Sequence, residues 1–124
     1  DNFESLPMMK VYTLEQTKDL IAQNKLEALI AKETLGTKDE CLVLSLDADA
    51  IDGAQMNSVS ATNPRGLSRD DVYAFMRAYL KVSKQIIFGI YEYNPLFDNL
   101  SMAVGKYLAG LLHYSLCHGE ALKK

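Results

Sequence analysis

The order of apolar and polar positions predicts strand–helix units along the chain. Residues 8–12 form a short apolar strand, and residues 14–30 then carry apolar side chains at helical spacing. Thr13 and Gln16 show the capping-box pattern that opens such a helix. The helical pattern becomes uneven at residues 23–25, which indicates a break there.

The second unit begins with the apolar run at residues 41–46, which only Ser45 interrupts. A run of this kind is typical of a strand that is buried on both faces of a parallel sheet. The long loop at residues 53–67 follows without periodicity, and Ser68 and Asp71 then form a capping pattern. The next helix has an apolar face of residues spaced by three and four: Val72, Phe75, Met76 and Tyr79.

A third unit follows the same plan. Residues 85–90 form an apolar strand, Pro95 ends it, and Asp98 or Asn99 caps the last helix. The buried stripe of that helix consists of Val104, Leu108, Leu111 and Leu112. Three such units imply parallel strands joined by right-handed helical crossovers, and therefore an α/β fold.

Acidic residues follow two of the predicted strands. Asp47 and Asp49 come after the second strand, and Glu92 comes after the third. Sites in open α/β sheets form beyond the carboxyl ends of the strands. On an extended backbone Asp47 and Asp49 point to the same side, and a divalent cation would relieve the repulsion between them. Hard ions such as Mg²⁺, Mn²⁺ or Ca²⁺ suit these ligands. The spacing alone is equally compatible with a solvated acidic turn, and Glu92 with a bond to nearby backbone.

Composition narrows the classes of partner. The 124 residues are 48% hydrophobic and 23% charged, which is ordinary for one globular domain. The net charge is −3 and there is no block of basic residues, so neither nucleic acid nor an anionic membrane is an expected partner. No apolar run reaches the roughly 20 residues of a membrane span.

The cysteines and the first residues bear on location. Cys41 and Cys117 are the only cysteines, and residues 1–9 lack the basic start of a signal peptide. This favours a reducing compartment over a disulfide, and we expect a cytoplasmic protein. His113 and His118 are interpreted as a helix-end and a tail histidine. The sequence begins at Asp1 instead of Met, so we expect a piece of a longer chain.

Three strings together resemble the C-terminal half of the arginase superfamily, the ureohydrolases. Residues 45–52 read Ser-Leu-Asp-Ala-Asp-Ala-Ile-Asp, residues 66–68 read Gly-Leu-Ser, and residues 92–95 read Glu-Tyr-Asn-Pro. The resemblance implies a three-layer α/β/α sandwich with a mainly parallel sheet, to which this chain supplies about three βα units. Residues 1–124 would be the C-terminal segment of one such domain, with a frayed tail at residues 119–124.

The resemblance also implies roles for the acidic residues. The family uses a binuclear Mn²⁺ centre, in which Asp47 matches the aspartate that bridges both ions and Asp49 matches one that chelates the second ion. Glu92 matches the glutamate that faces the guanidinium or formimino end of the substrate, and Asp52 shapes the loop. The family activates water for attack on a trigonal carbon. Its other ligands, a histidine and an Asp-x-His-x-x-x-Asp string, have no match here. We therefore expect the isolated chain to bind metal weakly and to lack catalysis without the N-terminal half of the domain.

The loop indicates a member of the family. Residues 59–61 read Val-Ser-Ala, where arginases and agmatinases carry a Thr-Gly-Thr-Pro-like string, and this looks more like formimidoylglutamase. That enzyme cleaves formimidoylglutamate to glutamate and formamide in histidine breakdown. Arginase, agmatinase and a non-catalytic homologue remain alternatives, as does an unrelated α/β domain that binds Mg²⁺. Family members also form homo-oligomers.

Overall fold

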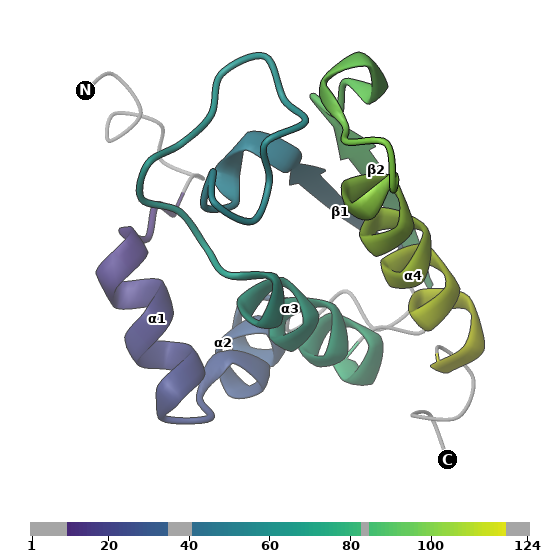
Figure 1. The fold of residues 1–124 in the computed structure, drawn as a ribbon. Coiled ribbons are helices and arrows are strands. Elements are labelled where there is room, and N and C mark those ends of the chain that lie inside the picture. Colours follow the sequence, from purple (N-terminus) through teal and green to yellow (C-terminus); the bar gives the residue numbers. More distant parts are fainter. Residues whose placement is uncertain (1–9, 35–40, 83–84, 119–124) are drawn as a thin grey trace.

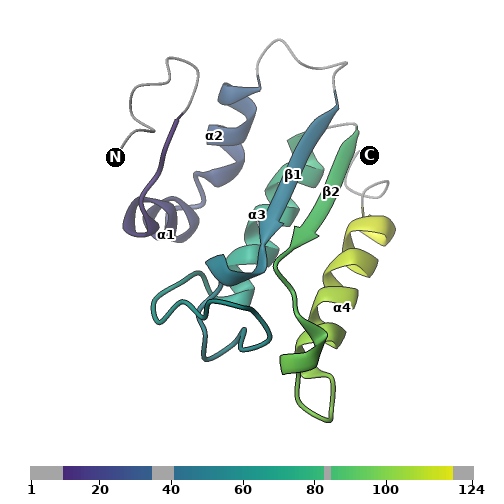
Figure 2. The same cartoon turned by 90° about the horizontal axis from the view of Figure 1, so that it is seen from above.

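The computed structural model describes residues 10–34, 41–82 and 85–118. Its helices and strands alternate along much of the chain (Figures 1 and 2). Their order is α1 (Leu14–Ala22), α2 (Leu26–Glu33), β1 (Leu42–Asp47), η2 (Ala48–Ala50), α3 (Arg69–Val82), β2 (Ile86–Tyr91), η3 (Pro95–Phe97) and α4 (Ala103–His118), where η marks a 3₁₀-helix. None of the described helices has the length and apolar character that crossing a membrane requires.

The two strands β1 and β2 pair in parallel, with Leu42 opposite Ile86 and Asp47 opposite Tyr91. Helix α3 is the crossover between them, which confirms the predicted α/β class. Figure 2 shows that both arrows end on the side where the long loop and η3 lie. The carboxyl ends of both strands therefore meet at one edge of the molecule.

The first predicted strand is wrong where the structure describes it. Residues 8 and 9 lie outside the described residues, and residues 10–12 form no strand. Val11 and Tyr12 are exposed, and the Lys10 ammonium forms an ion pair with Glu33 of α2. A strand needs a neighbour for its backbone N–H and C=O groups, and this segment has none within the described part of the chain.

The start and the break of the first helical segment are as predicted. The Gln16 N–H donates to Thr13 Oγ1 at 3.2 Å, and the Thr13 N–H donates to Gln16 Oε1 at 2.8 Å, which completes a capping box. Helix α1 ends at Ala22 and α2 begins at Leu26. Between them Asn24 has a φ of 54°, a left-handed conformation that ends a helix.

Helices cover one face of the sheet in the described structure. Leu44, Phe88 and neighbours of alternate spacing pack against the main core, which α3 and α4 complete. The side chains between them lie on the other face, where Val43 is 66% exposed and Ile87 is 60% exposed. The prediction of burial on both faces is therefore wrong for these residues, because no described element lies against the outer face.

The helices α3 and α4 supply the rest of the core. Ser68 and Asp71 form the predicted capping box, with bonds of 2.8 and 3.1 Å. Leu112 contradicts the prediction: it is 42% exposed, because it lies about 100° around the helix from the fully buried Leu111. The buried core residues of these two helices are Val72, Met76, Leu80, Val104, Leu108 and Leu111.

A smaller cluster joins α3 to α2. Leu26 and Ile30 of α2 pack against Ala78, and Phe75 and Tyr79 lie partly buried beside them. The four predicted apolar positions of α3 thus all pack against neighbours, two in the main core and two against α2. Helix α3 therefore packs between the sheet and α2.

Candidate metal centre

The two aspartates of the predicted metal motif lie at the end of β1. Asp47 is the last residue of the strand and is exposed, and Asp49 is half-buried within η2. Burial raises the pKa of the Asp49 carboxyl, and the charge of Asp47, a hydrogen bond with its side chain and the charge of Glu92 raise it further. The structure thus brings together the carboxylates that the sequence singled out.

The route to this proximity differs from the one expected. The backbone is extended at Asp47, but it then turns into a 3₁₀-helix, so the side-by-side arrangement of an extended strand does not apply at Asp49. Ala48 and Ile51 have no exposed surface, and both belong to the main core. Burial of these two apolar side chains makes the chain turn and leaves the carboxylate between them at the surface.

A glycine allows the neighbouring strand-like segment to approach this turn. Leu67 N–H donates to the Ala50 carbonyl at 3.0 Å, and Asp52 N–H donates to the Leu67 carbonyl at 2.8 Å. A Cβ on Gly66 would lie 2.5 Å from the Asp52 nitrogen and 2.6 Å from the Ala50 oxygen. Only glycine fits there without movement of the backbone.

Asp52 shapes the loop that follows. Its Oδ1 accepts a hydrogen bond from the Ala54 N–H at 2.9 Å. Its carbonyl accepts from the N–H groups of Gln55 and Met56, at 2.8 and 2.9 Å. The side-chain bond closes an Asx-type turn and the carbonyl bonds close a backbone turn, which agrees with the structural role interpreted from the resemblance.

Glu92 directly follows β2 and has a φ of 62°. This left-handed conformation is uncommon for a residue other than glycine, and such strain clusters at functional sites. The Ser60 hydroxyl donates to Glu92 Oε2 at 3.3 Å. The Asn94 N–H donates to the carbonyl of the fully buried Ser58 at 2.7 Å. The long loop is therefore held against the end of β2, close to the acidic residues.

Sequence patterns did not reveal these loop contacts. Ser58 and Ser60 lie in a segment without periodicity, and their partners are more than 30 positions away in the chain. The Val-Ser-Ala string was the one signal, and it came from the resemblance.

The acidic residues fit part of a metal site. Aspartate oxygens suit a hard divalent ion, and a cation between them would offset the repulsion that raises the Asp49 pKa. Within the described residues, no group of three or more His, Cys, Asp or Glu side chains could hold a metal ion. Their assignment as ligands stays a prediction.

The histidines and cysteines lie elsewhere. His113 is 3.5 Å from the Cys117 sulfur, and His118 stacks on Tyr114, all on the last turns of α4. This helix starts near the carboxyl end of β2 and runs back along it, so its last turns lie far from the acidic residues (Figure 2). Cys41 and Cys117 are both free thiols.

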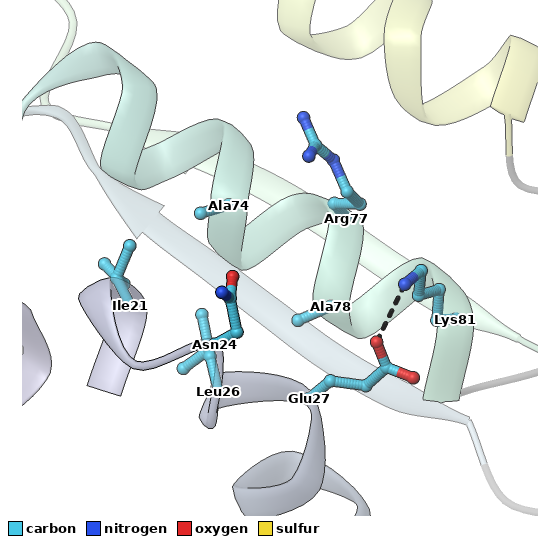
Figure 3. Close-up of a pocket in the computed structure, with 8 residues that line it drawn as sticks. All are labelled: Ile21, Asn24, Leu26, Glu27, Ala74, Arg77, Ala78 and Lys81. Atoms are coloured by element: carbon cyan, nitrogen blue, oxygen red, sulfur yellow. Dashed lines mark hydrogen bonds and ion pairs between the residues drawn. The ribbon is translucent and has the colours of Figure 1, made fainter.

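A hollow of about 240 Å³ lies between α3 and the turn that joins α1 to α2 (Figure 3). Ala74 and Ala78 contribute small side chains to its wall, and the Glu27–Lys81 ion pair of 2.9 Å lies beside it. Figure 3 shows the Arg77 side chain projecting away from this ion pair. The hollow contains none of the acidic site residues.

Comparison with known proteins assigns the family. Residues 4–115 match the model of the arginase family, so the chain belongs to that family, as the sequence resemblance predicted. A search of curated proteins gives no match.

Solved structures of the family have the same fold. Proclavaminate amidino hydrolase from Streptomyces clavuligerus matches with a TM-score of 0.73 and 23% identity, over 94% of this chain and 36% of that one. Formimidoylglutamase from Bacillus subtilis gives 0.74 and 18%, over 90% and 34%. Arginase from Bacillus caldovelox gives 0.68 and 22%, over 86% and 35%. The chain spans about a third of the length of these relatives. At these identities the likeness shows a shared fold.

Proposed function

We propose that this chain is the C-terminal part of a cytoplasmic manganese-dependent hydrolase of C–N bonds in formimino or guanidino compounds. The observation that carries the proposal is the meeting of Asp47, Asp49 and Glu92 at the carboxyl ends of two adjacent parallel strands. In an arginase-family chain, a cation or a cationic substrate at this place would favour the ionised form of Asp49, which burial and the neighbouring charges disfavour.

Each carboxylate has a role in this proposal. Asp47 and Asp49 would hold Mn²⁺, which supplies Lewis-acid activation of water and of the trigonal carbon when bound. Glu92 would face the cationic formimino or guanidinium end of the substrate and pair with it. The strained backbone of Glu92 and its bond from Ser60 hold the carboxylate in place before substrate arrives.

The remaining ligands would come from the rest of the domain. An apolar hollow of about 260 Å³ runs along β1, with Phe75 and Tyr79 of α3 on its other side. Consecutive residues of β1, 44–47, line it, so it follows the open edge of the strand. The exposed Val43 and Ile87 lie on the outer face of the same sheet. Parallel sheets are normally covered on both faces, so we assign these surfaces to the missing part of the same domain.

Formimidoylglutamate is the proposed substrate, with glutamate and formamide as products. The support is the Val-Ser-Ala string at residues 59–61, whose Ser60 bonds to Glu92 beside the place of the substrate's formimino group. Arginine and agmatine are the alternative substrates in the same reaction class.

The test is an assay of the complete protein that carries this chain, loaded with Mn²⁺, on formimidoylglutamate, arginine and agmatine. The expected result is a preference for formimidoylglutamate, and Asp47→Ala should abolish the activity. Preference for arginine or agmatine would assign the substrate differently. No turnover of any of the three would refute the proposal and favour a non-catalytic homologue.

A further inference from the structure

Arg69 lies where the long loop, α3 and α4 meet. Its backbone N–H donates to Gln55 Oε1 at 2.8 Å, and its guanidinium Nη2 donates to the Gln55 carbonyl. The guanidinium carbon lies 4.7 Å from the centre of the Tyr107 ring, which is a cation–π contact. The Tyr107 hydroxyl donates to the Arg69 carbonyl at 3.3 Å. One residue therefore bonds to a loop residue and to a residue of α4.

The contact with Gln55 leads back to the acidic residues. The Gln55 N–H donates to the Asp52 carbonyl, and Asp52 begins the turn three residues after Asp49. The near end of this turn is already held through Leu67. Arg69 holds its far end, so both ends of the segment that follows Asp49 are attached to the residues at and just before the start of α3.

The contact with Tyr107 leads to the other half of the site. Tyr107 is part of α4, whose first turn binds the Asp98 carboxylate through the N–H of Gly105 at 2.8 Å. The Tyr93 hydroxyl donates to the same carboxylate at 3.1 Å, and Tyr93 directly follows Glu92. Arg69 thus connects the loop of Asp47 and Asp49 with the element that follows Glu92.

Packing alone does not account for an arginine here. Its Nε is buried and has no hydrogen-bond partner within the described structure, which is a cost that an apolar side chain of similar length would avoid. A charged, forked side chain is needed only to stack on Tyr107 and bond to Gln55 together.

We propose that Arg69 is a positioning residue of the acidic site. It does not contact the carboxylates, and it acts by holding the turn after Asp49 and the α4 side of the site in one arrangement. The inference rests on the proposed function for the metal itself, and on the contacts above for the loop.

The experiment compares Arg69→Met, Arg69→Lys and the control Arg77→Met in the complete protein that carries this chain. Arg77 is exposed on the same helix and projects away from the neighbouring ion pair (Figure 3). Mn²⁺ affinity is measured by water-proton relaxation, amide hydrogen exchange over residues 53–67 by mass spectrometry, and unfolding by circular dichroism. For Arg69→Met we expect about tenfold weaker Mn²⁺ binding, the lower range for loss of a group that orients metal ligands. We also expect faster exchange in the loop without a lower melting temperature. Arg69→Lys should recover part of both effects, and Arg77→Met should change neither.

Two results would overturn the inference. One is an Arg69→Met protein with the same loop exchange as the unmodified protein. The other is faster loop exchange with unchanged Mn²⁺ affinity, when the control Asp47→Ala abolishes Mn²⁺ binding in the same assay. If the unmodified protein binds no Mn²⁺ at millimolar concentration, its proposed metal role fails separately. Loop exchange then decides alone whether Arg69 holds the turn.

Discussion

At the scale of single residues, the acidic pair would exchange stability for the proposed metal binding. Asp49 is half-buried next to the charge of Asp47, so its ionised form is disfavoured in the metal-free fold. Function at such a position is recognised by this local conflict, because a residue kept for stability alone would not be charged there.

Replacement of Asp49 tests this exchange. Asp49→Asn removes the repulsion and keeps the size of the side chain, so the chain should melt at an equal or higher temperature in chelator. It should also lose the rise in melting temperature that we expect millimolar Mn²⁺ to cause in the unmodified chain. Thermal unfolding at pH 7 with and without Mn²⁺ measures both effects, and Asp19→Asn on α1 is the control. A lower melting temperature in chelator would contradict the prediction.

Asp98 is the opposite case, a carboxylate that the fold favours. Burial raises its pKa, but hydrogen bonds from the N–H groups of Gly105 and Val104 and from the Tyr93 hydroxyl outweigh burial and leave the pKa below its ordinary value. A lowered pKa stabilises the fold above the unfolded value of about 3.9. That stability is lost as the pH falls through the folded value.

The pH dependence of unfolding follows from this sign. Asp98→Asn should lower the melting temperature at pH 7, and the gap to the unmodified chain should close as the pH falls below about 4. Melting curves from pH 7 to pH 2 provide the measurement. A gap that stays constant over this range would show that the lost packing of the side chain matters and its charge does not.

At the scale of elements, local signals and long-range contacts differ in how well sequence predicts them. Both capping boxes, the break at Asn24 and the apolar face of α3 were predicted, because each depends on residues within about four positions. The strand predicted at residues 8–12 is wrong for residues 10–12, because strand formation needs a distant partner that a local pattern does not show. The arrangement of Asp47 and Asp49 was predicted only in outcome. Its cause is burial of Ala48 and Ile51, which depends on the folded core.

Gly66 offers a test of how the turn at η2 packs. In Gly66→Ala the added Cβ meets backbone atoms at 2.5 and 2.6 Å, so two segments must separate. We expect a loss of about 1–3 kcal/mol in the free energy of unfolding, the usual range for overpacking. Urea denaturation measures the loss.

The matched control is Gly110→Ala in the middle of α4. Its Cβ would meet only the Tyr73 hydroxyl, at an ordinary 3.5 Å. Alanine is the better helix former, so this change should raise stability by up to about 1 kcal/mol. If both variants lost stability equally, the close approach at Gly66 would not be the cause.

At the scale of the whole molecule, the chain is one part of a family fold. It spans about a third of its relatives, and its described strands form a two-stranded sheet with one covered face. The apolar run at residues 41–46 correctly predicted a strand, but its predicted burial on both faces is not found in the described structure, where Val43 is exposed. The family match supplies the context that local patterns lack.

The uncovered sheet face makes a final prediction about the chain by itself. Val43 and Ile87 lie opposite each other on adjacent strands, and both are more than half exposed, so they form a continuous apolar surface. The isolated chain should therefore bind a hydrophobic dye and self-associate at micromolar concentration. Val43→Thr with Ile87→Thr keeps β-branched side chains while it makes the face more polar, and should reduce both effects. The control pair, Leu96→Thr with Leu116→Thr, removes two leucines that are more exposed than Val43 and Ile87 and lie apart on η3 and α4. Sedimentation velocity and dye fluorescence distinguish the pairs: an equal reduction in both would mean that general surface hydrophobicity, and not the open sheet, drives association.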